Sequence, residues 1–319
     1  MVDKANPDKN DIEVDENVRC QWEQEQDSLK TKLIVEDVYP WQKQLTDSSA
    51  MTNLKYVAGV DLSFVKGDNV TACACLVVLG YPDLQEVYSN CSPVKLTAPY
   101  IPGFLAFREV NFLVDEVNRL KRMKPQYVPD VVLVDGNGLL HPKEFGLACH
   151  LGVLIDIPCI GVGKALFHVG GLEKNAEHMS KIQKMEKGGD TFRLVSDSGR
   201  VLGMALRSCE STTNPIYVSV GHKISLETAT LLVEKCCKHR IPEPVRQADM
   251  KSREYLRVTF NSDGGGRDQK AKLPATKKPT DRNRTQPVSS SFLDDEGSDE
   301  EGESSFGDYW DRSTKTAPQ

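Results

Sequence analysis

DVVLVDGNG, at residues 130–138, is the stretch that decides the fold. Four apolar residues stand between Asp130 and Asp135, a pattern typical of a strand that is buried on both faces of a partly parallel sheet. The glycine-rich turn after Asp135 lies where such sheets commonly build a site, beyond the carboxyl end of a strand. We therefore predict an α/β domain with Asp135 in its functional site.

The sequence before this strand predicts a three-stranded meander and a helix. Residues 56–64 (YVAGVDLSF) and 70–79 (VTACACLVVL) are β-rich segments joined by a polar turn, and residues 84–97 add a third, more polar strand. After Pro102 the apolar residues recur at helical spacing as far as Lys124. The chain thus changes from strands to a helix before it enters the buried strand.

The segments downstream extend this α/β pattern. The expected elements are a helix at residues 142–152, a strand at 157–162, a hairpin at 191–209, a strand at 216–222 and a helix at 226–238. An amphipathic helix at about residues 18–33 precedes the meander. Together these elements predict a mixed central sheet with helices on its faces.

Composition excludes several classes of protein. No apolar run approaches the roughly 18 residues that a membrane span needs, and the charged first 16 residues contain no apolar stretch that would indicate secretion. The nine cysteines include no CxxC pair, which favours reduced structural thiols over a disulfide framework or a zinc site. We expect an intracellular protein, in the cytoplasm or in the nucleus including the nucleolus, with no membrane partner.

The charge pattern divides the chain into three parts. We predict a flexible N-terminus at residues 1–14, a catalytic domain at 15–260 and a disordered, charged C-terminal tail at 261–319. The tail lacks apolar periodicity and contains an acidic run, DDEGSDEEGE, so much of the net charge of −6 lies outside the domain. The tail could bind other proteins or act as an inert linker.

Three carboxylates stand at positions where a site could form. Asp61 interrupts an apolar strand, where an ionised carboxylate is costly unless it binds a cation or is paired. Glu109 lies in the helix after Pro102, and Asp135 ends the buried strand. Together they could hold Mg²⁺ or Mn²⁺, which prefer oxygen ligands and support phosphodiester hydrolysis. Taken singly, each could be a hydrogen-bond acceptor, a helix surface charge or a loop cap.

The motifs around these residues resemble the endonuclease V family. They are YVAGVDLSF, APYIPGFLAFRE, VLVDGNGLLHP, GVGK and GHKISLETA, and they lie in this order within residues 41–256. The resemblance implies an α/β fold of the ribonuclease H-like kind, with a mixed central sheet and helices on both faces. It also implies that Asp61, Glu109 and Asp135 form a metal-binding triad for Mg²⁺, which Mn²⁺ can replace.

The PYIP motif is a candidate substrate-binding element. Pro99, Tyr100, Ile101 and Pro102 form a turn whose two prolines restrict the backbone. In the family this motif is similar to a wedge that separates strands, and such wedges unstack a base so that a pocket can read it. A stiff strand-to-helix turn with Tyr100 packed inward is the structural alternative.

Three glycines are candidates for the base pocket. Gly103, Gly136 and Gly138 let the backbone approach a ligand closely. The resemblance implies a pocket of main-chain groups that accepts hypoxanthine and rejects adenine, because adenine would leave buried groups unpaired. An ordinary turn after a strand is the alternative for Gly136 and Gly138.

Three further polar residues are secondary catalytic candidates. Lys164 follows a buried strand and could contact a phosphate as a point charge, but the P-loop spacing is missing, which disfavours ATP as a substrate. His222 could act near the metals or be a satisfied structural histidine. Asp249 matches a recurrent acidic position in the family, and a helix surface is its alternative location.

The resemblance implies an enzyme that acts on nucleic acid. We expect a monomeric, Mg²⁺-dependent endonuclease that cleaves inosine-containing single-stranded RNA at the second phosphodiester bond 3′ to inosine, leaving a 3′-hydroxyl and a 5′-phosphate. The alternatives are a DNA repair endonuclease acting on deoxyinosine and a protein that binds inosine-containing RNA without cleaving it. A phosphatase acting on small nucleotides is disfavoured, because the PYIP wedge suits a polymer.

Overall fold

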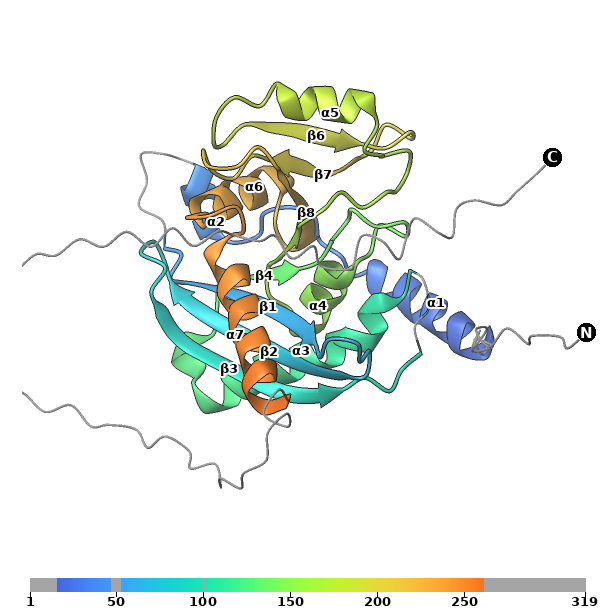
Figure 1. Cartoon of the computed structure of the whole chain (residues 1–319), viewed down its shortest axis with the longest axis vertical. Coiled ribbons are helices and arrows are strands. Elements are labelled where there is room, and N and C mark those ends of the chain that lie inside the picture. The colour runs from blue at the N-terminus through green and yellow to red at the C-terminus, as the bar shows by residue number, and fades with distance from the viewer. Residues whose placement is uncertain (1–15, 47–52, 100, 102, 261–319) are drawn as a thin grey trace, which may run out of the picture. The chain divides into compact units, whose positions relative to one another are not determined.

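An eight-stranded mixed sheet runs through the domain in this computed structural model, which describes residues 16–46, 53–99, 101 and 103–260 (Figure 1). Its strand order is β3-β2-β1-β4-β5-β8-β7-β6. Strands β1, β4 and β5 are parallel to one another, and the other pairs are antiparallel. The strands are β1 Tyr56–Phe64, β2 Thr71–Gly80, β3 Glu86–Lys95, β4 Val131–Asp135, β5 Cys159–Gly163, β6 Thr191–Val195, β7 Val201–Leu206 and β8 Ile216–His222.

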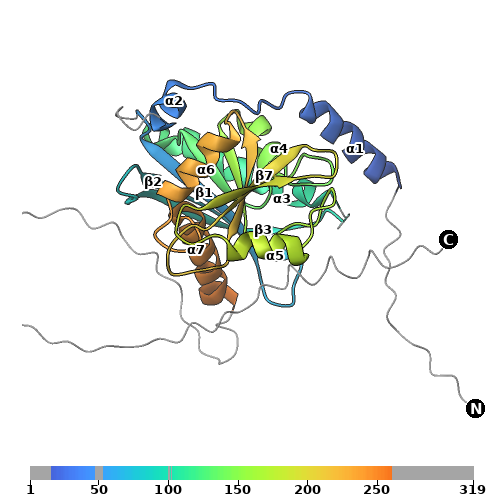
Figure 2. The same cartoon turned by 90° about the horizontal axis from the view of Figure 1, so that it is seen from above.

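Helices cover both faces of this sheet. They are α1 Glu16–Lys30, α2 Pro40–Thr46, α3 Leu105–Met123, α4 Leu147–Ile155, α5 Ala176–Gln183, α6 Leu226–Lys235 and α7 Glu243–Phe260, with a short 3₁₀ turn at Pro125–Tyr127. Figure 2 shows α3 and α4 on one side of β1 and α7 on the other. Two hydrophobic clusters match these layers, one with side chains of α3 and α4 and one with side chains of α6 and α7.

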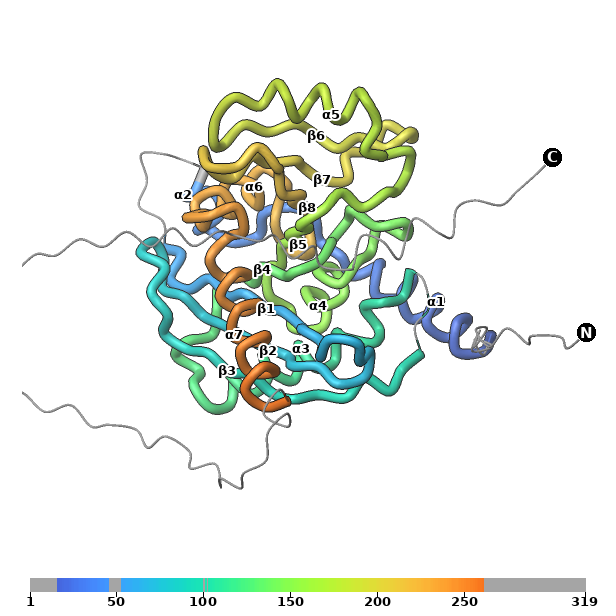
Figure 3. The backbone as a smooth tube through the Cα atoms, viewed as in Figure 1, coloured from blue at the N-terminus to red at the C-terminus, as the bar shows by residue number. Residues whose placement is uncertain are grey.

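The close packing of α7 on the sheet depends on one glycine in β1. Helix α7 crosses β1 and β2 (Figure 3). A Cβ atom on Gly59 would lie 1.9 Å from the carbonyl oxygen of Pro244, which is much shorter than any real contact. Glycine therefore lets the first turn of α7 rest directly on the strand. This contact fixes where the rest of α7 lies relative to the end of β1.

The predicted strands and the helices at α1, α3 and α6 are confirmed. The helix expected at residues 142–152 begins later, at Leu147, because the preceding residues form turns in which Glu144 N–H donates to His141 O and Gly146 N–H donates to Gly138 O. Helices α2, α5 and α7 were not predicted. The buried stripe of α7 includes small or polar side chains such as Ala248 and Ser252, which do not by themselves indicate a helix packed on the sheet.

All nine cysteines are free thiols, as the sequence indicates. In the described part of the chain, no helix combines the length and apolar character that a membrane span requires. The segments predicted to be flexible or disordered, residues 1–14 and 261–319, lie outside the described residues.

Replacing Gly59 with alanine is expected to destabilise the domain by about 1–3 kcal/mol, the usual cost of overpacking. The added methyl group would force the backbone of α7 away from β1. The free energy of unfolding from urea denaturation measures this change. Gly80→Ala is the matched control, since its Cβ would make only ordinary contacts, the nearest at 3.5 Å. Equal stability of the two variants would contradict this account of α7.

Candidate active site

Three aspartates from three elements meet at one end of the parallel strands. Asp61 lies in β1, Asp135 ends β4 and Asp249 lies in α7; each offers an oxygen within 4.8 Å of the others. Val60 pairs with Val134 in the parallel register, so the next residues of the two strands, Asp61 and Asp135, are neighbours. The arrangement concentrates negative charge at one point, which is the setting in which a divalent cation binds.

Lys164 supplies positive charge to this cluster. Its Nζ lies 2.7 Å from Asp135 Oδ2 and 3.1 Å from Asp249 Oδ1. Arg253 adds a second contact to Asp249 Oδ1, at 3.0 Å. Burial alone would lower the pKa of Lys164, but attraction to the aspartates outweighs burial and raises it. The ammonium is therefore charged where it lies between two carboxylates.

Asp61 is the most enclosed of the three aspartates. It is 6% exposed, and its Oδ2 accepts hydrogen bonds from Ser63 Oγ at 2.8 Å and from Ser252 Oγ at 2.7 Å. Burial and, next, the charge of Asp135 raise the pKa of Asp61 to about 7, although the two serine hydrogen bonds act in the opposite direction. Without a cation, Asp61 is thus poised between its neutral and ionised forms near neutral pH.

Glu109 approaches from the other face of the sheet. It lies near the start of α3, is 6% exposed, and has a pKa raised to about 8 by burial and by the charge of Asp61. The tight cluster of the structure therefore contains Asp249 where the predicted triad has Glu109. The difference arises because α7 lies on the face to which Asp61 points, whereas α3 covers the opposite face.

The structure does not bring His222 to the carboxylates. Strand β8 is antiparallel to β5, so His222 pairs with Cys159, whereas Asp135 pairs with Val162, about 10 Å further along β5. His222 Nδ1 instead accepts a hydrogen bond from the backbone N–H of Ile34 at 3.3 Å. This position favours the structural alternative for His222.

The glycines after β4 differ in their surroundings. Gly138 is packed against the chain itself, because a Cβ there would lie 2.0 Å from Val220 O, and its N–H donates to Ser219 Oγ at 2.8 Å. The close approach that Gly138 allows is therefore to β8 and not to a ligand. Gly103 has a φ of +83° with open space beside it, so it remains available for a ligand. Gly136 has a φ of +150° and packs against Leu147, because a Cβ there would lie 3.5 Å from Leu147 Cδ2.

Asn137, between the two glycines, was missed by the sequence reasoning. Its Oδ1 is buried and has no hydrogen-bond partner among the described residues. The atom lies 2.9 Å from the place where a Cβ on Gly163 would stand. Gly163 immediately precedes Lys164. In the GNG motif the glycines indicate a turn, whereas the asparagine between them carries the unpaired acceptor, Oδ1.

The PYIP segment is only partly described. Tyr100 and Pro102 lie outside the described residues, and Pro99 is half-buried. Ile101 is 3% exposed, and its carbonyl accepts a hydrogen bond from Phe104 N–H at 2.9 Å as part of a turn. The side chain of Ile101 is therefore buried in the domain and is not exposed to enter a base stack.

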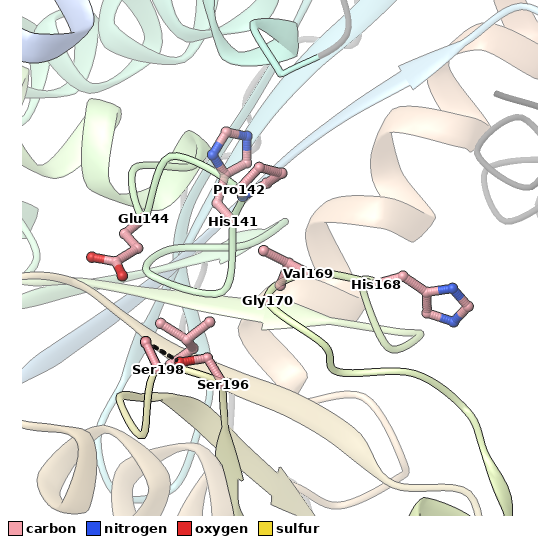
Figure 4. Close-up of a pocket in the computed structure, with 9 residues that line it drawn as sticks. His141, Pro142, Glu144, His168, Val169, Gly170, Ser196 and Ser198 are labelled. Carbon is pink, nitrogen blue, oxygen red and sulfur yellow. Dashed lines mark hydrogen bonds between the residues drawn. The ribbon is translucent and has the colours of Figure 1, made fainter. Parts of the chain in front are cut away.

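A pocket of about 370 Å³ lies on another part of the surface, between the loop after β4 and the β6–β7 turn (Figure 4). His141, His168 and Ser196 are among its lining residues, and none of the site carboxylates lines it. Its one acidic residue, Glu144, is paired with Arg200. The pocket is therefore separate from the acidic cluster.

The mixed sheet and the acidic cluster at the end of its parallel strands define an α/β nuclease with a ribonuclease H-like fold. The Endonuclease V family profile matches residues 40–250. Endonuclease V of Mus musculus is 56% identical over 243 residues, covering 76% of this chain and 71% of that protein. The human Endonuclease V is 54% identical over 243 residues, covering 76% and 85%. The chain belongs to the endonuclease V family.

Solved structures agree with this assignment. The catalytic domain of human Endonuclease V matches with a TM-score of 0.75 at 51% identity, covering 77% of this chain and 99% of that chain. An Endonuclease V of Ciona intestinalis matches with a TM-score of 0.69 at 37% identity, covering 77% and 99%. The Ciona structure is a complex with a 23mer DNA that contains an inosine followed by a ribo-adenosine.

The raised pKa values predict a pH-dependent stability for the metal-free protein. A carboxyl group whose pKa is raised on folding stabilises the fold at low pH, and this contribution is lost as pH rises from its unfolded pKa through its folded pKa. For Asp61 the window runs from 3.8 to about 7. In the presence of a chelator, the melting temperature should fall less between about pH 5 and about pH 8 in Asp61→Asn than in wild type. An equal fall in melting temperature for the two proteins over this pH range would contradict the raised pKa of Asp61.

Proposed function

We propose that this chain is a Mg²⁺-dependent endonuclease that cleaves inosine-containing single-stranded RNA at the second phosphodiester bond 3′ to inosine, leaving a 3′-hydroxyl and a 5′-phosphate. One observation carries the proposal: Asp61, Asp135 and Asp249 place oxygens within 4.8 Å of one another at the end of the parallel strands. Membership of the endonuclease V family and the inosine in the Ciona complex support the substrate.

The donor set fits Mg²⁺, and Mn²⁺ as a substitute. All three clustered ligands are carboxylate oxygens, the hard donors that these ions prefer, and no cysteine or histidine belongs to the cluster. Glu109 is a fourth carboxyl close enough for its pKa to respond to the charge of Asp61. A bound cation would polarise the phosphoryl oxygen and lower the pKa of an attacking water.

The chain's own residues supply positioning and charge. Lys164 bridges Asp135 and Asp249, and its charged ammonium can contact a phosphate oxygen of the substrate beside the carboxylates. Gly103 leaves room for a base next to the backbone.

The choice of RNA rests on the sugar that follows inosine. In the Ciona complex the nucleotide after the inosine is a ribo-adenosine within DNA. A protein that requires the 2′-hydroxyl at that position distinguishes RNA from DNA there. The DNA of the same complex also makes a DNA repair endonuclease the second candidate, so the decisive experiment must vary this one sugar.

We expect Asp135→Asn to lower the rate of cleavage at least about a hundredfold, because loss of a ligand should exceed the 10–100-fold effect of an outer-shell change. The fold should remain, since asparagine has nearly the same shape and the side chain is partly exposed. Single-turnover cleavage and the melting temperature measure the two effects. Asp115→Asn, the same change at an exposed position of α3, is the matched control, and wild-type cleavage by Asp135→Asn would contradict the site.

Four labelled strands test the substrate directly: RNA with one inosine, the same RNA with adenosine, DNA with one deoxyinosine, and that DNA with a single ribonucleotide after the deoxyinosine. With Mg²⁺ we expect cleavage of the first and fourth strands, at the second phosphodiester bond 3′ to inosine. Equal cleavage of the all-DNA strand would indicate DNA repair instead. Tight binding of inosine RNA without cleavage would indicate a reader of inosine.

A further inference from the structure

Two serine hydroxyls hold one oxygen of Asp61. Ser63 Oγ lies 2.8 Å and Ser252 Oγ 2.7 Å from Asp61 Oδ2, and the two hydroxyls lie 2.7 Å apart. Ser63 is two residues further along β1, whereas Ser252 comes from α7, 191 positions away in the chain. The three oxygens therefore form a closed triangle that joins the strand to the helix.

The triangle has a definite chemical consequence. Each hydroxyl has a single proton to donate. Asp61 Oδ2, Ser63 Oγ and Asp249 O all lie within hydrogen-bond distance of Ser252 Oγ, whose one proton serves one of these acceptors at a time. The two hydroxyls together limit rotation of the Asp61 carboxylate. Among the described residues, Asp61 Oδ1 accepts no hydrogen bond, so this oxygen is left for a cation. The hydroxyls thus leave Asp61 with one hydrogen-bonded oxygen, Oδ2, and one oxygen, Oδ1, that is free to bind a cation.

Ser252 also ties Asp61 to the helix that carries Asp249. Its Oγ lies 2.9 Å from Asp249 O, and the side chain is fully buried. The neighbouring buried positions of α7, Val245, Ala248 and Leu256, are apolar or small. A buried hydroxyl in such a stripe is costly unless it is hydrogen-bonded. The partners that compensate for this cost are the carboxylate of Asp61, the hydroxyl of Ser63 and the backbone carbonyl of Asp249.

We propose that Ser252 and Ser63 are positioning residues for the metal centre. They orient the free oxygen of Asp61 toward the cation and hold Asp61 and Asp249 in a fixed relative position. This role rests on the metal-dependent function proposed above. Neither serine is required to touch the substrate. Groups that orient metal ligands in this way typically change metal affinity or activity by 10–100-fold when they are removed.

Direct binding of Mn²⁺ to the full chain, without nucleic acid, tests the role. The concentration of free Mn²⁺ is measured by electron paramagnetic resonance during the titration of the protein. We expect Ser252→Ala to raise the Kd for Mn²⁺ by about tenfold or more and Ser63→Ala to raise it less, because Ser63 is only half-buried. Ser63→Thr keeps the hydroxyl and should restore wild-type affinity.

Ser225→Ala is the matched control for lost stability. Ser225 caps α6, where its Oγ accepts from Thr228 N–H at 3.2 Å and donates to Asp37 at 2.9 Å, and it belongs to no part of the site. This variant should melt at a lower temperature and still bind Mn²⁺ like wild type. The affinity for inosine RNA in the absence of metal should be the same in all five proteins, which a general distortion of the site would not allow.

The outcomes separate this role from the proposed function. A folded Ser252→Ala protein that binds Mn²⁺ within about twofold of wild type would overturn the positioning role and leave the metal site standing. Wild-type protein that binds no Mn²⁺ would overturn both. If Ser252→Ala does not fold, the pair Ser63→Ala and Ser63→Thr decides, and equal affinities in that pair would overturn the role.

Discussion

The mutual repulsion of carboxylates at one end of the sheet is the constraint on which the rest of the site depends. Asp61, Asp135 and Asp249 cannot all be ionised at such short range without nearby positive charge. In the protein alone, Lys164 supplies part of this positive charge by bridging Asp135 and Asp249. Burial first, and the neighbouring carboxylates next, raise the pKa values of Asp61 and Glu109. A divalent cation would offset the same repulsion more completely, which is why the proposed function places one there.

The packing around the site holds these three charges close together against their mutual repulsion. Parallel pairing of β1 and β4 places two of the aspartates side by side, and the direct contact of α7 with Gly59 brings the third. The serine triangle then locks strand to helix within the site itself. Repulsion between the buried acids lowers the stability of the fold at the site. The apolar layers on both faces of the sheet compensate for this loss.

Much of this could be predicted from the sequence, and the limits have physical reasons. Asp61 and Asp135 stood out because each interrupts or ends an apolar strand, a local pattern. Asp249 was only a secondary candidate, because no local pattern separates it from a helix surface charge and only the packing of α7 on β1 brings it to the other aspartates. Ser252 gave no signal, since its partner is 191 positions away and only the tertiary structure joins them. Burial of Ile101 and the distance of His222 from the site likewise depend on packing and strand direction, which single motifs do not encode.

Anomalous diffraction from crystals soaked with Mn²⁺ tests the central claim most directly. The account predicts an anomalous peak about 2 Å from oxygens of Asp61, Asp135 and Asp249, with Lys164 Nζ displaced from at least one of its two carboxylate partners. Crystals that show no peak at a saturating Mn²⁺ concentration, with the Lys164 bridge intact, would contradict it. The cluster would then be an ion-pair network completed by Lys164 and Arg253.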